Sequence, residues 1–148
     1  MDINGIAHIQ LTVTDMERSR AFYRRLLVDC FGMTVLYDAP IIFYCIGART
    51  GIAITPAADD LRGDGFHQRR PGLHHLCFRA RSREDVDELH RVLVDMGATI
   101  VHAPEEGPWA PGYYSVLFED PDGIRLEMNF VPGKGNLDPA VATPSRRP

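Results

Sequence analysis

Hydrophobic and polar residues alternate along several short stretches of the chain, whereas two longer stretches carry apolar residues at helical spacing. Alternation with a period of two is typical of a strand with one buried face, and a period of 3.6 is typical of an amphipathic helix. The strands that this pattern predicts cover about residues 7–13, 32–37, 41–46 and 51–55 in the first half, and 75–80, 97–102, 113–119 and 123–130 in the second half.

The two halves of the chain repeat the same order of elements. The segments "GIAHIQLTVTDMERSRAFYRRLL", from Gly5, and "GLHHLCFRARSREDVDELHRVLV", from Gly72, both read glycine, two residues, histidine, a short strand and an amphipathic helix. Internal similarity of this kind indicates that one structural unit is used more than once. The sequence therefore predicts two copies of a strand–helix–strand–strand–strand module, written βαβββ below.

Local signals mark both ends of each predicted helix. Asp15 and Ser82 are N-cap candidates, and Asp85 follows Ser82 by three residues, as in a capping box. Gly32 and Gly97 suit the C-termini, because glycine tolerates the left-handed backbone that often ends a helix. The apolar residues predicted to face the core are Met16, Ala21, Phe22, Leu26 and Leu27 in the first helix, and Val86, Leu89, Val92, Leu93 and Met96 in the second.

These elements predict a single α+β domain made of two modules. The first module is expected to cover residues 1–56 and the second residues 73–131. Residues 57–72 are rich in Gly, Asp and Pro and read as a linker. Residues 132–148 contain four prolines and no periodicity, so we expect a poorly ordered tail or a strap over a partner subunit.

The polar faces of three predicted strands carry residues that bind metals. His8, His75 and Glu127 each lie on the face opposite the apolar residues of their own strand. On a single strand, contact with water would explain such a residue equally well. Three ligands at corresponding places instead favour a shared concavity, where two imidazoles and one carboxylate would bind a divalent metal and leave positions open for substrate.

Composition and charge exclude several classes of function. The chain has 148 residues, a net charge of −4 and a pI near 5.8, so it lacks the positive charge expected of a nucleic-acid-binding protein. No apolar stretch approaches the roughly 20 residues that span a bilayer, and no signal-peptide pattern is present. Cys30, Cys45 and Cys77 are an odd number of cysteines, which predicts reduced thiols. We expect a cytoplasmic protein that binds a small molecule and neither nucleic acid nor membrane.

The doubled module, "GIAH", "GLHHLCF" and "FEDPDGIRLE" together resemble the vicinal oxygen chelate superfamily. This superfamily includes glyoxalases, methylmalonyl-CoA epimerase, extradiol dioxygenases, and fosfomycin- and bleomycin-resistance proteins. The similarity covers about residues 5–131, and "DPDG" followed four residues later by Glu127 is its most specific element. It implies paired βαβββ modules that form a cupped, barrel-like mixed sheet with the helices outside.

The resemblance also implies a metal site. The ligands of the superfamily correspond to His8, His75 and Glu127, around a divalent ion such as Fe, Mn, Zn or Ni. His74 competes with His75, but His74 shares the face of the apolar residues that follow, which favours His75. If Gly51 corresponds to Gly123, Thr55 stands where glyoxalase-like isomerases usually place a carboxylate or amide.

Other residues are candidates for catalysis and substrate binding. Glu127 and Tyr113 are the catalytic candidates, and Tyr113 is favoured over Tyr114 because Tyr114 shares the apolar face of its strand. His67 and His102 could carry protons, but a solvated position on the surface is the favoured explanation for each. The residues that we expect to contact substrate are Thr55, Cys77, Arg79, Trp109 and Arg125.

The sequence leaves three functions open. The first is a divalent-metal-dependent enzyme, related to the glyoxalases in the broad sense, which binds vicinal oxygens and stabilises an oxyanion. The second is an Fe(II) extradiol dioxygenase, although the segment just ahead of the final hairpin, "PEEGPWAPGYY", contains no histidine. The third is a metal-free binding or resistance protein of the bleomycin-resistance type. We expect a homodimer in each case, because exposed sheet edges favour pairing.

Overall fold

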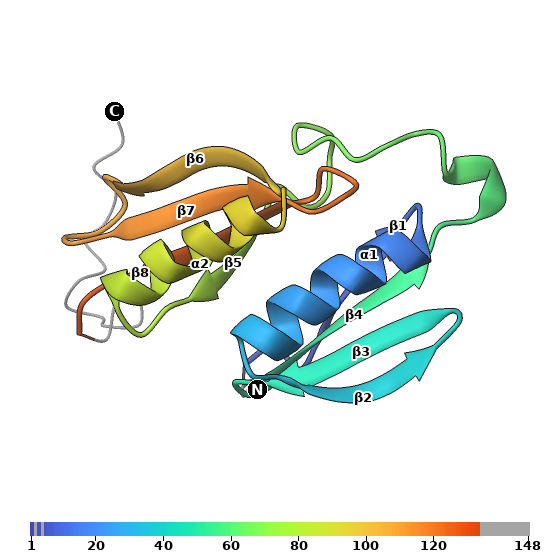
Figure 1. Cartoon of the computed structure of the whole chain (residues 1–148), viewed down its shortest axis with the longest axis horizontal. Helices are drawn as coiled ribbons and strands as arrows, with labels where there is room; N and C mark the ends of the chain where they lie inside the picture. The colour runs from blue at the N-terminus through green and yellow to red at the C-terminus, as the bar shows by residue number, and fades with distance from the viewer. Residues whose placement is uncertain (2, 4, 134–148) are drawn as a thin grey trace. The chain divides into compact units, whose positions relative to one another are not determined.

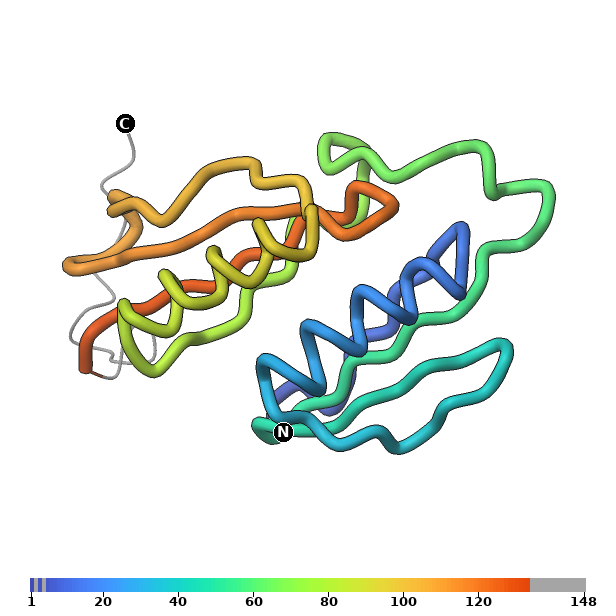
Figure 2. Tube along the Cα trace, in the orientation of Figure 1, coloured from blue at the N-terminus to red at the C-terminus, as the bar shows by residue number. Residues whose placement is uncertain are grey.

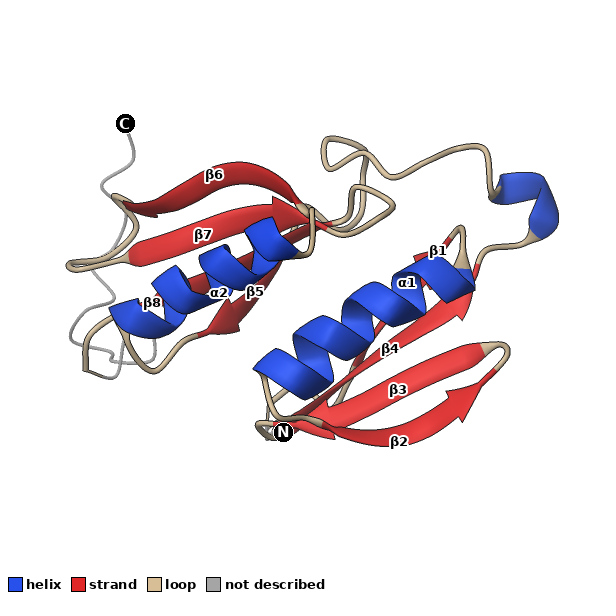
Figure 3. Ribbon diagram, viewed as in Figure 1, coloured by secondary structure: helices blue, strands red, loops and turns tan. Residues whose placement is uncertain are grey.

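A computed structural model of the chain describes residues 1, 3 and 5–133; the predicted tail lies almost entirely outside them. The chain forms two compact units, and Pro121–Gly123 belongs to the first unit together with Met1–His67. Each unit has one four-stranded sheet and one main helix, as Figures 1 and 3 show. The prediction of an α+β fold with two βαβββ modules is therefore confirmed.

The first unit has the strand order β1-β4-β3-β2. Strands β1 and β4 are parallel, and the other pairs are antiparallel, so the sheet is mixed. Helix α1 packs on β4 and is continued by a π-helical segment, η1. The bounds are β1 Ile9–Val13, α1 Met16–Tyr23, η1 Arg24–Cys30, β2 Thr34–Ala39, β3 Ile42–Gly47, β4 Thr50–Pro56 and the short 3-10 helix η2 Asp59–Leu61.

The second unit repeats this topology with the strand order β5-β8-β7-β6. Again the pair formed by the first and last strands is parallel, and the other pairs are antiparallel. The trace in Figure 2 runs from β4 through a long connection before it enters β5. The bounds are β5 Leu76–Arg79, α2 Arg83–Asp95, β6 Thr99–Glu106, β7 Tyr114–Glu119 and β8 Arg125–Phe130.

Side chains cap both helices as the sequence predicts. The Asp15 carboxylate accepts hydrogen bonds from the backbone N–H groups of Glu17 and Arg18, both at 3.0 Å. Ser82 and Asp85 form a complete capping box at the start of α2. The residues after the helices, Gly32 and Gly97, have φ values of 64° and 67°, which a residue with a side chain adopts at a cost.

Each unit buries one face of its sheet under its helix. One detail of the predicted first helix is wrong: Ala21 is exposed, and Tyr23 is fully buried instead. Tyr23 follows the buried Ser19 by four residues and precedes Leu26 by three, which is the spacing of one helical face, whereas Ala21 lies off that face. The main core residues are Leu11, Val13, Tyr23, Leu26, Leu27, Phe43, Ile52 and Ile54 in the first unit, and Val86, Leu89, Leu93, Val116, Phe118 and Leu126 in the second.

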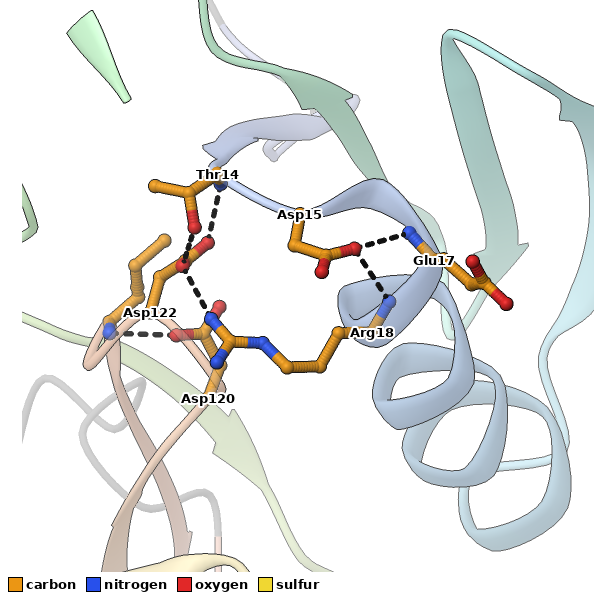
Figure 4. A network of polar contacts seen from close by, with 7 residues as sticks. Thr14, Asp15, Glu17, Arg18, Asp120 and Asp122 are labelled. Atoms are coloured by element: carbon orange, nitrogen blue, oxygen red, sulfur yellow. Dashed lines mark hydrogen bonds and ion pairs between the residues drawn. The ribbon is translucent and has the colours of Figure 1, made fainter. Parts of the chain in front are cut away.

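The "DPDG" turn between β7 and β8 has a separate structural role for each aspartate. Asp120 accepts a hydrogen bond from the backbone N–H of Ile124 at 2.8 Å, which closes the turn. Asp122 accepts from the Thr14 backbone N–H at 2.7 Å, from the Thr14 hydroxyl, and from Arg18 at 3.1 Å (Figure 4). The Asp122 side chain therefore holds the turn against the end of β1 and the start of α1.

No helix within the described residues is long and apolar enough to cross a membrane. The three cysteines are free thiols, with Cys45 buried and Cys77 exposed.

Candidate functional site

Glu127 is a buried carboxylate of the second unit. It lies in β8 between β5 and β7, and only 7% of its surface is exposed. The Tyr113 hydroxyl donates a hydrogen bond to Oε1, and His75 Nε2 lies 3.1 Å from Oε2. Burying a carboxylate is costly unless hydrogen-bond donors surround it. The polar face of the β5–β8–β7 sheet therefore contains a site that holds Glu127 in a fixed position.

Two groups next to Glu127 keep their protons. Burial, followed by the hydrogen bond to Glu127, raises the pKa of Tyr113 well above its ordinary value. Burial, followed by the negative charge of Glu127, also raises the pKa of the Cys77 thiol, although part of the residue meets solvent. Cys77 lies directly opposite Glu127 in the β5–β8 pair. At neutral pH both groups are therefore hydrogen-bond donors, and Cys77 lacks the thiolate that a nucleophile needs.

The loop before β7 places an aromatic surface beside Tyr113. The Gly107 N–H donates to the Tyr113 carbonyl and the Tyr113 N–H donates to the Ala110 carbonyl, both at 3.1 Å. A Cβ atom on Gly107 would lie only 3.0 Å from ring atoms of both Trp109 and Tyr113. A side chain at this position would therefore force the two rings to move by a few tenths of an ångström. Trp109 remains 75% exposed, so its ring is available to a ligand.

The two predicted anion-binding arginines differ in their surroundings. Arg125 Nε lies 3.5 Å from Oε1 of Glu119, its cross-strand neighbour in β7, so much of its charge is already balanced. Arg79 is exposed at the end of β5. Of the two, Arg79 is the more accessible cation for a substrate carboxylate or phosphate. His102, in β6, contacts the carbonyl of Ala103 at 2.9 Å.

In the first unit, His8 is part of an aromatic group. Its ring meets the edge of the Tyr44 ring, with the centroids 6.3 Å apart, and Tyr44 stacks on Tyr37 at the same centroid distance. A Cβ atom on Gly51 would lie 2.5 Å from the Tyr44 ring and hydroxyl, so the absence of a side chain lets Tyr44 lie over the sheet. Sequence reasoning did not identify Tyr44 or Tyr37; the glycine within a predicted strand was the available signal.

Strand register corrects one assignment. In the parallel pairs, Gln10 lies opposite Ala53 and Cys77 lies opposite Glu127. Since Gln10 and Cys77 occupy equivalent positions of the repeat, Ala53 is the counterpart of Glu127. The prediction that Thr55 occupies that position is wrong, because it aligned Gly51, which lies within β4, with Gly123, which lies in the turn before β8. Thr55 instead accepts a hydrogen bond from Gln10 at 3.3 Å.

The donor chemistry of the second unit fits part of a divalent metal site. Imidazole nitrogen and carboxylate oxygen are common ligands, and two ligands each about 2 Å from one ion lie roughly 3 Å apart. His75 Nε2 and Glu127 Oε2 have a separation of 3.1 Å. Across residues 1, 3 and 5–133, no three His, Cys, Asp or Glu side chains gather closely enough to hold an ion. His8 lies in the other unit, so its role as the third ligand stays a prediction.

Comparison with known proteins identifies the family. The family model described as the Glyoxalase/Bleomycin resistance protein/Dioxygenase superfamily matches residues 5–128. The chain belongs to this superfamily. The resemblance seen in the sequence is therefore confirmed, and the two βαβββ modules of the structure agree with it.

Several known proteins resemble the chain over most of its length. The uncharacterized protein YqjT of Bacillus subtilis is 31% identical over 123 residues, which cover 82% of this chain and 94% of the relative. The metallothiol transferase FosB of Shouchella clausii is 24% identical over 86% of this chain and 80% of its own. A crystal structure from Bacillus halodurans, provisionally described as a glyoxalase, has a TM-score of 0.77 and 30% identity, covering 86% of this chain and 96% of that one.

Proposed function

We propose that the protein is a divalent-metal-dependent enzyme, glyoxalase-related in the broad sense, that binds a small substrate through two adjacent oxygens. His75 and Glu127 would hold the ion together with His8. The observation that supports this most directly is the pair formed by His75 Nε2 and the buried Glu127 carboxylate, 3.1 Å apart. Membership of the superfamily agrees with the proposal.

The residues around the ion have distinct tasks in this proposal. The ion itself supplies Lewis-acid stabilisation of negative charge that develops on a substrate oxygen. Glu127 is a ligand and a candidate general base, and the Tyr113 hydroxyl fixes the carboxylate by donating to Oε1. Because the Tyr113 phenol keeps its proton, it can also donate toward an oxyanion.

Substrate contacts belong to the same proposal. Trp109 offers an exposed aromatic surface beside Tyr113, and Arg79 offers an exposed positive charge. Cys77 lies directly opposite Glu127, and we propose that it contacts the substrate as a small side chain. Thr55 and Arg125 remain candidates, although each already has a partner within its own unit.

Two alternative activities remain. Ala53 places a methyl group at the repeat position of Glu127, so that position supplies no fourth protein ligand. Open coordination positions suit an Fe(II) extradiol dioxygenase. The relative named metallothiol transferase suggests a second alternative, metal-dependent transfer of a thiol. The buried Glu127 carboxylate makes a metal-free binding protein the least supported of the predicted functions.

A homodimer and a cytoplasmic location also stay predictions. Within the described residues, β1 and β2 are the edges of the first sheet, and β5 and β6 are the edges of the second. Edge strands expose unpaired backbone groups, which another strand can cover.

The test is metal analysis of protein purified without added ions. His75→Ala and Glu127→Ala should each lose most of the bound metal, and His8→Ala should do the same if His8 is the third ligand. His90→Ala, on helix α2, is the matched control and should retain it. Equal metal content in all four variants would contradict the proposal.

Assays on the metal-loaded protein separate the reactions. Oxygen uptake with catechols would identify a dioxygenase, and loss of free thiol with fosfomycin would identify a transferase. Conversion of a 2-oxoaldehyde in the presence of a thiol would support the glyoxalase-related activity.

A further inference from the structure

Two adjacent histidines form a hydrogen bond through the same type of ring nitrogen. Nδ1 of His74 lies 2.8 Å from Nδ1 of His75, and the rings meet edge to face with their centroids 5.1 Å apart. A hydrogen bond between two Nδ1 atoms requires one ring to carry a proton there and the other to offer a lone pair. The tautomer of one neutral ring therefore determines which tautomer the other ring adopts.

The other nitrogen of His75 faces Glu127. Since His75 Nε2 lies 3.1 Å from the carboxylate, the ring has a defined neighbour on each side. With a proton on Nε2, His75 donates to Glu127 and accepts from His74. With its proton on Nδ1, His75 donates to His74 and has a lone pair free on Nε2.

We propose that His74 is a positioning residue for metal binding: it accepts a hydrogen bond from His75 Nδ1–H and so stabilises the tautomer in which Nε2 of His75 is free to bind the ion. This inference rests on the proposed function, since it assumes that His75 is a ligand. The sequence left His74 as a competitor of His75 for the role of metal ligand. Here His74 is not a ligand but orients His75. Partners that hydrogen-bond to a metal-binding histidine orient its ring and increase its basicity.

The proton count balances between the two arrangements. When His75 changes from Nε2–H to Nδ1–H, its Nε2 proton passes to solvent. The proton on His74 Nδ1 crosses the 2.8 Å hydrogen bond to His75, and His74 takes up a proton on its own Nε2. The neutral pair neither gains nor loses a proton overall. An imidazole suits this position because the same atom, Nδ1, donates in one arrangement and accepts in the other.

The expected effect is moderate. Removing a hydrogen-bond partner of a metal-binding histidine typically weakens metal binding by about 10–100-fold. The His75 side chain is 36% exposed, so water can partly replace His74. We therefore expect an effect near the lower limit, about tenfold.

The experiment uses three variants of the full chain and Zn²⁺ as the probe. His74→Phe keeps a ring of similar size but removes the acceptor. His74→Asn keeps an acceptor, because its amide oxygen stands near the place of Nδ1. His90→Phe is the matched control on helix α2. The dissociation constant is measured by competition with a chelator, and the Nδ1 proton of His75 is followed by NMR in the Zn²⁺-loaded protein.

His74→Phe should weaken Zn²⁺ binding about tenfold and lose the NMR signal of the Nδ1 proton through exchange with water. His74→Asn and His90→Phe should keep both the affinity and the signal. An affinity of His74→Phe within about twofold of the original protein, or an equal loss in His74→Asn, would overturn the inference.

The variants His75→Ala and Glu127→Ala separate this result from the proposed function. If these two variants keep the metal, the proposed site itself is wrong. If they lose it while His74→Phe binds normally, only the role of His74 is wrong.

Discussion

Asp122 offers a direct test of how the "DPDG" turn stabilises the protein. Its side chain is only 6% exposed and accepts two hydrogen bonds from Thr14, one from the backbone and one from the hydroxyl. A third comes from Arg18, whose side chain is 54% exposed. The substitution Asp122→Ala removes all three acceptor contacts and leaves the partly buried Thr14 groups without a partner.

The expected loss follows from these contacts. A hydrogen bond to a charged group is worth about 1.5–3 kcal/mol, and an exposed ion pair such as that with Arg18 is worth less than about 1 kcal/mol. Asp122→Ala should therefore lower the free energy of unfolding by about 3 kcal/mol. For a chain of this size, that corresponds to a fall in Tm of about 6–12 °C. Asp122→Asn keeps one acceptor oxygen and should lose about half as much.

Thermal and urea unfolding measure this difference. Asp59→Ala is the control, because the Asp59 side chain is 94% exposed and forms only an ion pair with Arg62 at 3.0 Å. We expect less than about 1 kcal/mol for the control. If Asp122→Ala destabilises the protein no more than Asp59→Ala does, the turn is not held by these hydrogen bonds, and the reasoning fails.

Three further predictions concern the second unit. Tyr113→Phe should weaken metal binding about tenfold, because Glu127 loses its hydroxyl donor; a chelator competition assay measures this. Tyr114 donates to Asp87 at 2.7 Å, and this hydrogen bond, followed by burial, raises its pKa. The stability that it contributes is complete below pH 10 and is lost as the pH rises through the folded-state value, so the stability difference between the original protein and Tyr114→Phe should shrink above pH 10 in urea unfolding. Cys77 is exposed but has a raised pKa, so iodoacetamide should modify it slowly at pH 7, as mass spectrometry of the labelled protein would reveal.

Each of these predictions has a result that contradicts it. Unchanged metal affinity in Tyr113→Phe would show that the Tyr113 hydroxyl does not contribute to metal binding. A stability difference for Tyr114→Phe that stays constant above pH 10 would show that the bond to Asp87 does not hold the Tyr114 proton. Labelling of Cys77 at the rate of a free thiol would contradict the raised pKa.

Local signals in the sequence were sufficient to define the elements of each module. Asp15 caps α1 and the Ser82–Asp85 pair caps α2, because capping involves only residues within one turn of the helix. Gly32 and Gly97 end the helices for an equally local reason, because each adopts a left-handed backbone that glycine tolerates. The alternation of side chains also placed Glu127 on the polar face of its strand. The repeat then predicted the two modules.

The tertiary structure decided which residues meet across strands. The pairing of β1 with β4 and of β5 with β8 made Ala53 the counterpart of Glu127, where the alignment of glycines had suggested Thr55. The pairing of β7 with β8 brought Glu127 beside Tyr113, which directly precedes β7. Register depends on hydrogen bonds between segments 43 residues apart in the first unit and 50 in the second, and a shift of two residues, such as that from Ala53 to Thr55, leaves every side chain on the same face. Periodicity within one strand contains no information about that shift, so only the folded sheet fixes the neighbours of Glu127.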